Sequence, residues 1–375
     1  MNEPRATRYQ RLRRRAAMAG WCLAGLTLTI FAATPASRWL SDMAWRVTAG
    51  LPDAAHAIVA LTFFLVLVLA AWEIAALPAV LYLALKIDHA YGRTEGHVED
   101  VLIAQAQATL FALPVVLAGG LIVSASAQLA GRWWWMAAGV LLSAGLVAIQ
   151  HGVPGVLARL SPARPMSKPE LSSRLHALAA RVRVPVAGIH EWVADERAMT
   201  ALVTGVGRGR RVLVSSDIVR TWPDDEIEVV VAHELAHHAH RDLWRTLGLD
   251  VAVMAAALLL ADRVLVVAGP ALNVAGPADL AALPLIALTA LVVWAVLSPI
   301  RHAQSRRHER RADAFALSWT GQADAFGAAV RRLSAKHLAD ERPSTLARWL
   351  YHRHPPVAER LALAESYRDN PVRRI

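Results

Sequence analysis

Residues 232–238 read Ala-His-Glu-Leu-Ala-His-His, and this short stretch is the most informative part of the chain. It contains the pattern His-Glu-x-x-His, in which two histidines are four residues apart. On a helix such residues lie on one face, so His233 and His237 can both reach a single metal ion. Glu234 lies beside that face, where its carboxylate can contact a water molecule on the metal. The stretch therefore predicts a helix that holds a metal and can activate water.

The residues around this stretch predict that its helix is buried. Pro223-Asp-Asp-Glu226 opens the helix with acidic residues, which complement the helix dipole in the first turn. Histidine and glutamate are costly to bury without a partner, which favours a metal. The alternative is a helix whose histidines are solvated or bonded to one another. His238 and His240 are expected to be solvated or to lie behind the metal ligands. The apolar neighbours are Ile227, Val229, Val230, Val231, Leu235 and Ala236.

A catalytic zinc ion needs a third protein ligand and one open position. Cys22 is the only cysteine and lies in an apolar run, so another residue type has to supply this ligand. The best candidate is Glu309, which shares a helix face with Asp313. Asp313 can accept the free ring N–H of a ligand histidine. A basic, solvated helix next to the membrane is the alternative for this segment. The rival ligands are His302 and His308.

The hydrophobic composition predicts an integral membrane protein. The chain is 55% hydrophobic and 19% charged, far from the average of soluble proteins. The first apolar run could be a cleaved signal peptide, but its length favours an uncleaved anchor. Each of six runs is near or above the roughly 20 residues that cross a bilayer as a helix. These runs lie at about 16–33, 57–86, 101–128, 133–152, 247–268 and 280–300.

The net charge of +10 comes from basic residues beside the apolar runs. Examples are the segments 11–15, 159–183 and 301–311. This placement is typical of cytoplasmic loops and does not favour nucleic-acid binding. Both termini and the polar region 153–246 are therefore predicted to be cytoplasmic, with the bilayer as a partner. The loop near 34–56 is predicted to lie on the other side of the membrane. The high arginine and alanine content hints at a bacterium, and hence at its inner membrane.

The polar region before the metal helix has the pattern of a small α+β unit. Residues 170–182 have apolar positions at helical spacing, and 187–193 read as a strand. Residues 201–214 read as two strands around a glycine-rich turn. The glycine spacing in that turn fits no phosphate-binding fingerprint, so we expect a hairpin.

Four stretches together resemble the membrane-bound zinc peptidases that include the CAAX prenyl proteases and the HtpX-type proteases. They are Ala232–His238, Glu309-x-x-Ala-Asp313, His354-Pro-Pro-x-x-Glu-Arg360, and Lys86-Ile-Asp-His-Ala-Tyr-Gly92 followed by Asp100. The resemblance extends over most of the chain from about residue 80 onward. Four apolar runs before the metal helix favour the prenyl-protease branch.

The resemblance implies one zinc ion per chain, bound by His233, His237 and Glu309. It implies that Glu234 is the general base and that Asp313 supports a ligand from behind.

His354 and Arg360 are implied to stabilise the oxyanion or to orient the site. The alternative is a structural Pro-Pro turn that starts a helix. The strand that begins at Thr200, Ala201 and Leu202 is implied to bind substrate by backbone pairing. The family usually has Asn-Ala where this chain has Thr200-Ala201, which puts substrate clamping in doubt.

We expect a mainly α-helical fold with about six membrane helices and a cytoplasmic α+β domain of the gluzincin type. Residues 1–156 would hold about four membrane helices. Residues 157–375 would form the zinc peptidase domain, interrupted by a membrane hairpin at about 247–300.

The predicted function is a membrane-embedded zinc endopeptidase acting on a peptide or protein, including membrane-associated ones. One alternative is a catalytically idle scaffold that keeps zinc for structure, but the intact Glu234 argues against it. Another is a transporter, because Glu73 and Asp262-Arg263 lie in apolar runs. These charges either line a polar cavity or pair with one another, for instance Asp262 with Arg263. No inverted repeat is visible, which counts against transport.

Overall fold

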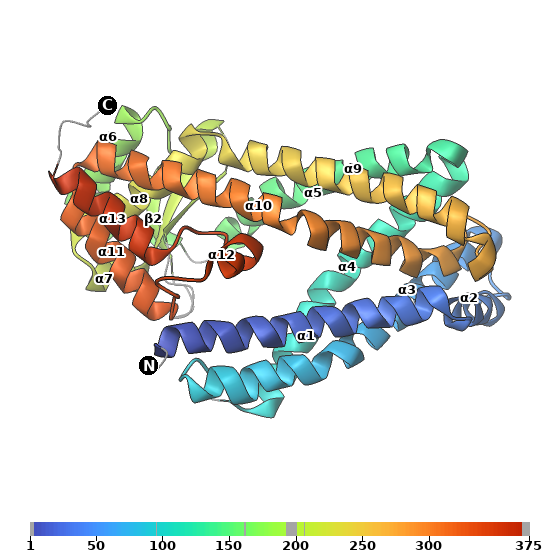
Figure 1. Cartoon of the computed structure of the whole chain (residues 1–375). Coiled ribbons are helices and arrows are strands. Elements are labelled where there is room, and N and C mark those ends of the chain that lie inside the picture. Colours follow the sequence, from blue (N-terminus) through green and yellow to red (C-terminus); the bar gives the residue numbers. More distant parts are fainter. Residues whose placement is uncertain (1–3, 95, 161–162, 193–200, 206, 370–375) are drawn as a thin grey trace. The chain divides into compact units, whose positions relative to one another are not determined.

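The computed structural model describes residues 4–94, 96–160, 163–192, 201–205 and 207–369. It consists mainly of helices, with one small sheet (Figure 1), as the sequence predicts. The helices are α1 (Arg5–Ala33), α2 (Ala36–Val47), α3 (Asp53–Tyr82), α4 (Val98–Ala130), α5 (Trp134–Leu160), α6 (Pro169–Arg181), α7 (Ser216–Thr221), α8 (Asp224–Ala239), α9 (Asp242–Ala268), α10 (Leu283–Thr320), α11 (Ala323–Lys336), α12 (Thr345–Tyr351) and α13 (Val357–Asp369). The strands are β1 (Ala163–Pro165), β2 (Gly188–Trp192), β3 (Ala201–Thr204) and β4 (Arg211–Ser215).

The chain divides into two compact units. The first contains residues 1–144 and 250–297, and the second contains 145–249 and 298–375. Helices α5, α9 and α10 contribute residues to both units. The predicted domain boundary near residue 156 stays a prediction.

Five stretches are long and apolar enough to cross a membrane. They are 5–33, 55–88, 98–150, 242–268 and 280–320. The stretch 98–150 contains two of the predicted runs, separated by a short turn at Gly131–Trp133. Gly131 adopts a positive φ of 51° there, which favours glycine. The expectation of about six membrane helices is therefore confirmed.

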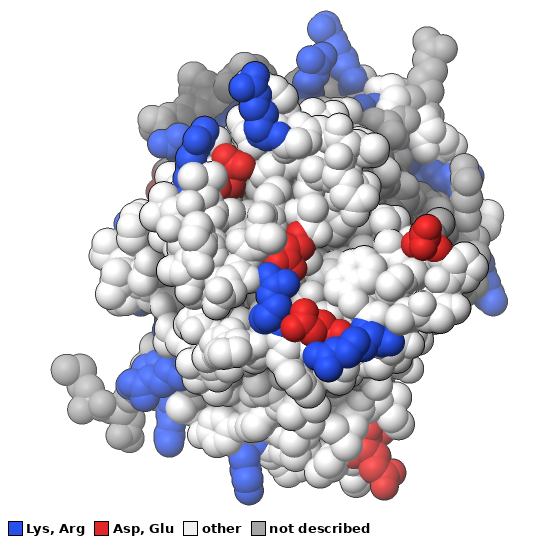
Figure 2. Space-filling model, turned by 90° about the vertical axis from the view of Figure 1, so that its right-hand side faces the viewer, with Lys and Arg blue, Asp and Glu red and all other residues white. Residues whose placement is uncertain are grey.

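The first unit has an apolar outside as well as an apolar core. Phe64 and Trp134 are fully buried among its helices. Phe111 and Leu129 are more than three-quarters exposed, at 80% and 89%. Large apolar surface of this kind marks contact with lipid or with another protein. Figure 2 shows the side on which α2 and the α9–α10 connection lie, and most of that face carries no charge.

The charged residues that the sequence places within apolar runs, Glu73 and Asp262-Arg263, have polar partners in the same unit. Gln105 Nε2 donates to Glu73 Oε2 at 2.6 Å. Trp134 Nε1 donates to Asp262 Oδ1 at 2.8 Å, and Arg263 Nε lies 3.8 Å from Asp262 Oδ2. These pairings offset the cost of placing carboxylates between apolar helices.

One helix of the first unit lies where the sequence was expected to form a connection. Residues 34–56 were predicted as a loop, and this was wrong for α2. Its buried positions include Leu40 and Ala44, which have helical spacing. Ser37 Oγ also donates to the carbonyl oxygen of Ala281 at 2.9 Å. Tertiary contacts of this kind hold a short helix whose sequence also contains exposed tryptophans, Trp39 and Trp45.

The second unit contains a four-stranded sheet in the order β1-β2-β4-β3. The β2–β4 pair is parallel, whereas β1–β2 and β3–β4 are antiparallel. The predicted hairpin is confirmed, with Ala201 opposite Val214 and Thr204 opposite Arg211. Strand β3 lies at the edge of the sheet formed by the described strands, next to α8.

The core of the second unit is formed where helices α6 and α8 pack together and α6 contacts strand β2. Leu171, Leu175 and Leu178 of α6 point into it at the helical spacing that the sequence predicts. Ile227, Val231 and Leu235 supply the buried face of α8, and each is 0% exposed. Helix α8 is thus held by its apolar side, which leaves its histidines on another face.

Replacement of Leu175 by alanine is expected to lower the free energy of unfolding of this unit. The leucine is 0% exposed, so its loss leaves a cavity that costs about 2–5 kcal/mol. Thermal unfolding of the detergent-purified protein measures the change. Ser173→Ala, at an exposed position of the same helix, serves as the control and should melt with the wild type. Equal melting temperatures for Leu175→Ala and wild type would contradict the packing described here.

Candidate active site

Helix α8 positions the two histidines of the informative stretch. It follows Pro223 and carries three acidic residues in its first turn, as the sequence predicts, and it ends at Ala239. The rings of His233 and His237 lie side by side, with centroids 5.0 Å apart and planes at 85°. Both imidazoles therefore face the same region. A metal-binding group there needs a third donor, which has to come from another part of the chain.

Helix α10 supplies that third donor. It is a single helix of 38 residues that contains Pro299 and runs on through Glu309 and Asp313. Glu309 Oε2 lies 3.5 Å from His233 Nε2, and Glu309 Oε1 lies 3.6 Å from His237 Nε2. The three donor atoms are within 4.8 Å of one another, and this is the group among the described residues that could hold a metal.

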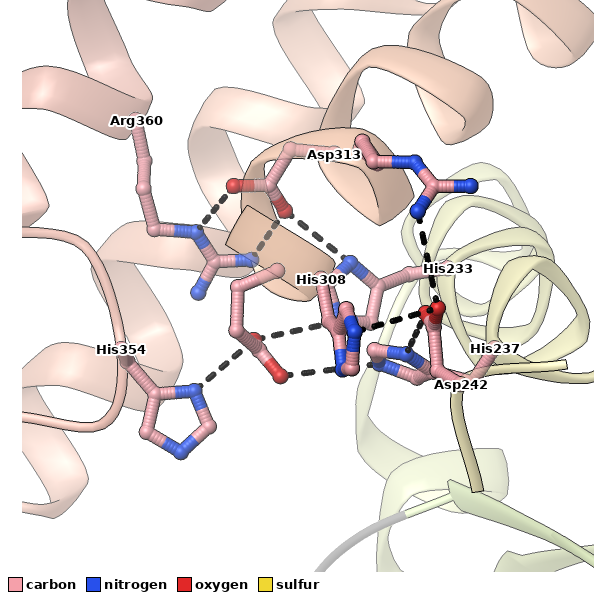
Figure 3. A network of polar contacts seen from close by, with 9 residues as sticks. His233, His237, Asp242, His308, Asp313, His354 and Arg360 are labelled. Carbon is pink, nitrogen blue, oxygen red and sulfur yellow. Dashed lines mark hydrogen bonds and ion pairs between the residues drawn. The ribbon is translucent and has the colours of Figure 1, made fainter. Parts of the chain in front are cut away.

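Two further carboxylates orient the histidines from behind (Figure 3). Asp313 Oδ1 lies 3.0 Å from His233 Nδ1, and Asp242 Oδ2 lies 3.1 Å from His237 Nδ1. With the Nδ1 atoms engaged in this way, both Nε2 atoms face Glu309. Carboxylate behind imidazole is the usual arrangement for histidines that ligate a metal through the other nitrogen.

The separations fit a zinc-sized ion. Zinc ligands at about 2.0–2.1 Å in a tetrahedral arrangement are about 3.3 Å from one another. The His233–Glu309 and His237–Glu309 separations of 3.5 and 3.6 Å are close to that value. Two imidazoles and one carboxylate are also a donor set that catalytic zinc sites use.

The electrostatics of the site favour a positive charge between these donors. Burial lowers the pKa of the His233 imidazole, but the carboxylates of Asp313 and Glu309 outweigh burial and raise it to about 10. The same carboxylates would stabilise a bound cation, which replaces the proton because a ligating imidazole must be neutral.

Glu234 faces a different environment from the metal donors. Burial raises the pKa of its carboxyl despite the opposing effect of His233 and His237. A carboxylate whose pKa is raised toward neutrality is better matched to accept a proton and return it.

The segment after α12 brings two more of the predicted residues to the group (Figure 3). His354 Nδ1 lies 2.8 Å from Glu309 Oε2, while the rest of its side chain is 70% exposed. Arg360 donates twice to Asp313, from Nε at 2.8 Å and from Nη2 at 2.6 Å. Pro356 also accepts from the backbone N–H of Arg360, so the Pro-Pro turn starts α13 as well.

A pocket of about 360 Å³ opens beside Glu234 and His237. Strand β3 and the following turn form one wall through Val203, Thr204 and Gly205. The carboxylate therefore faces an open space that is bordered by the edge strand.

His238 ties this edge strand to the metal helix. Its Nε2 lies 3.1 Å from the carbonyl oxygen of Val203, and its Nδ1 lies 3.2 Å from Arg210 Nε. Burial lowers the pKa of His238, which suits a neutral ring that accepts from Arg210 and donates to Val203.

The other predicted residues fall outside the donor group. Thr200 lies outside the described residues, whereas Ala201 and Leu202 belong to β3. His308 Nε2 lies 3.6 Å from Asp242 Oδ1, so this rival ligand supports the site from behind. His302 is not in the donor group, and His240 packs edge-on against Phe315 at 5.4 Å.

Asp242 is the residue of the site that sequence reasoning missed. It is 4% exposed and contacts His237, with His308, Arg245 and Arg311 also within 4 Å. The available signal was an acidic residue five positions after His237 and five positions before the apolar run at 247–268. Its position at the start of α9 makes it resemble an ordinary helix-starting aspartate, which hides its contact with the histidine.

A model of a known protein family matches residues 165–368, which include every described residue of the site. That family is described as peptidase family M48. The chain belongs to peptidase family M48. The family membership confirms the resemblance to membrane-bound metallopeptidases that the four sequence stretches indicated.

Curated relatives of this M48 chain include metalloproteases from several bacteria. It is 27% identical over 213 residues to the uncharacterized metalloprotease YhfN of Bacillus subtilis. That match covers 55% of this chain and 50% of YhfN. It is 28% identical over 286 residues to a protein named Protease HtpX homolog in Acidiphilium cryptum, covering 67% of this chain and 96% of that protein.

A solved structure shares the fold of this M48 chain. The crystal structure of S. mikatae Ste24p matches with a TM-score of 0.71 and 19% sequence identity. The match covers 86% of this chain and 80% of Ste24p, so it extends well beyond the three donor residues. With the five apolar stretches, the comparisons identify an integral membrane protein of a metalloprotease family.

Replacement of Asp242 by asparagine is expected to weaken zinc binding about 10- to 100-fold, because His237 loses the carboxylate that orients it. Competition against a chelating dye, with the detergent-purified protein, measures the affinity. Asp324→Asn removes a carboxylate whose side chain is 88% exposed on α11, and it should bind zinc as the wild type does. An unchanged affinity for Asp242→Asn would show that the 3.1 Å contact does not support the ligand.

Proposed function

We propose that this chain is a membrane-embedded zinc endopeptidase that binds one zinc ion through His233, His237 and Glu309. The convergence of these three donors on one point is the observation that carries the proposal. Membership in peptidase family M48 supports a protease and a zinc cofactor.

A bound zinc ion would polarise the substrate carbonyl and lower the pKa of a water molecule. Glu234 borders the open pocket beside His237, and its raised pKa suits proton transfer. We assign it the role of general base, which takes the proton of the attacking water and returns it to the leaving amine.

The remaining residues of the site hold or assist these groups. Arg360 uses two donors on Asp313, which in turn contacts His233, so we assign Arg360 a positioning role. His354 is largely exposed while one nitrogen contacts Glu309. Its other nitrogen is free to turn toward the developing oxyanion, which gives His354 a catalytic role.

The substrate would bind as an extended strand along β3. Ala201 and Leu202 are in this edge strand, and its open side can pair with a peptide backbone. His238 would hold β3 at a fixed distance from α8 through its contact with Val203. The predicted part of Thr200 in substrate binding stays a prediction, because this residue lies outside the described residues. Backbone pairing tolerates different side chains, so membrane-associated proteins and peptides are the substrate class we propose.

Two other functions are less well supported. A zinc scaffold without activity would not need Glu234 beside an open pocket. A transporter would need its intramembrane charges for passage, yet Glu73 and Asp262 already have partners. Family membership also favours a protease over both.

Glu234→Gln is expected to abolish peptide cleavage and to leave zinc bound. Removal of a general base costs about 10²- to 10⁴-fold in rate, whereas the amide does not disturb the three donors. Casein or peptide cleavage and the zinc content of detergent-purified protein are the two measurements.

Glu365→Gln, at an exposed position of α13, is the matched control and should cleave normally. A chelator should abolish wild-type cleavage. Zinc in both proteins with equally negligible cleavage would favour the scaffold, and absence of zinc from both would refute the proposed site.

We also propose that the protein lies in a bacterial inner membrane with both termini and the active site in the cytoplasm. The concentration of basic residues beside the apolar runs supports this orientation. In a Cys22→Ser background, Ser366→Cys on α13 should resist an impermeant maleimide in spheroplasts and react in inside-out vesicles. Gly50→Cys, in the loop after α2, should show the opposite pattern. Labelling of the Ser366→Cys variant from outside would contradict the orientation.

A further inference from the structure

A basic pocket of about 330 Å³ lies between α10 and α12 in the second unit. Its lining includes four arginines and one tryptophan: Arg306, Arg307, Arg310, Arg348 and Trp349. This pocket is distinct from the one beside Glu234 and shares no residue with it. The proposed hydrolysis makes no use of it.

The pocket has an excess of positive charge. Arg310 pairs with Glu359, and Arg306 donates from Nη1 to the carbonyl oxygens of Arg348 and His352 at 2.9 and 2.6 Å. In the part of the chain that the structure describes, neither Arg307 nor Arg348 has a carboxylate partner. Like charges gathered in one cavity repel one another, so an anion bound there would be stabilised.

The position of the pocket residues along α10 places this pocket close to the membrane surface. The apolar run of this helix ends near Ile300, and the pocket residues begin at Ala303. At 1.5 Å per residue, positions 303 to 310 lie about 5–15 Å beyond the end of the run. The polar layer on each side of the hydrocarbon core is about 5–8 Å thick. Long arginine side chains can therefore reach the level of lipid phosphates.

Helix α12 provides the apolar contacts expected at such a surface. None of its residues is buried. Leu346, Trp349 and Tyr351 are 65%, 52% and 41% exposed. Tryptophan and tyrosine are enriched at the membrane interface, and apolar side chains beside basic ones favour a lipid surface over a small soluble anion.

We propose that this pocket binds the phosphate of an anionic phospholipid headgroup, with α12 lying in the membrane interface. Arg307 and Arg348 would bind the phosphate oxygens, which guanidinium groups match in geometry. Trp349 would border the glycerol backbone of the lipid. The buried Arg306 would hold α12 in place through its two backbone carbonyl contacts.

The test uses the full-length protein, purified in detergent and stripped of lipid. Native mass spectrometry would follow its titration with phosphatidylglycerol, phosphatidylcholine or inorganic phosphate. We expect tight retention of phosphatidylglycerol only, and about 10- to 30-fold weaker retention in Arg307→Gln/Arg348→Gln, since the two charges act on the anion together. This readout does not depend on proteolysis or on bound zinc, so it can fail or succeed separately from the proposed hydrolysis.

Arg164→Gln/Arg220→Gln removes two positive charges elsewhere in the second unit and is the matched control. Arg164 is exposed on β1, and the Arg220 side chain is 74% exposed on α7. Equal loss in the control would indicate general attraction to anions and overturn the site. Equal retention of phosphatidylcholine, or competition by inorganic phosphate at equal concentration, would also overturn it. The comparison of lipids on the wild type decides the matter even where a variant folds poorly.

Discussion

The site depends on three carboxylates that surround the imidazoles of His233 and His237 in a partly buried region. Glu309 faces both Nε2 atoms, while Asp313 and Asp242 occupy the Nδ1 sides. Such a concentration of negative charge is unfavourable in a protein interior unless cations neutralise it. Arg360 supplies one cation through Asp313. The donor group offers a place for a second cation, so metal binding is expected to stabilise this part of the chain.

The arrangement depends on two helices that are held in different ways. Helix α8 is fixed by the apolar core of the second unit, which buries one of its faces completely. Helix α10 begins as an apolar segment and becomes a polar one, so its sequence combines a membrane stretch with two site residues. Glu309 and Asp313 are one turn apart on it, and therefore one face serves both the metal and the histidine behind it.

Much of this could be predicted because spacing along a helix is a strong signal. The pairing of His233 with His237, and of Glu309 with Asp313, follows from a separation of four residues. Contacts between separate elements leave no such local pattern. Asp242 looks like an ordinary helix start, and α2 is a short helix held by contacts with distant residues. The residues alone left His302 and His308 as rivals of Glu309, because the direction in which each side chain points depends on tertiary packing.

Pro299 lies inside α10, close to the end of the apolar run and ahead of the site residues. Proline removes one backbone hydrogen bond of a helix, so bending is easiest there. A helix that adapts its tilt to bilayer thickness would thus bend ahead of Glu309 and leave the rest of the helix straight. The segment from Pro299 to Glu309 acts as a short rigid arm, about 15 Å long at 1.5 Å per residue. For the proposed hydrolysis, its length would set the distance from the hydrocarbon at which a peptide bond can be cut, and so which stretch of a membrane-anchored substrate is within reach.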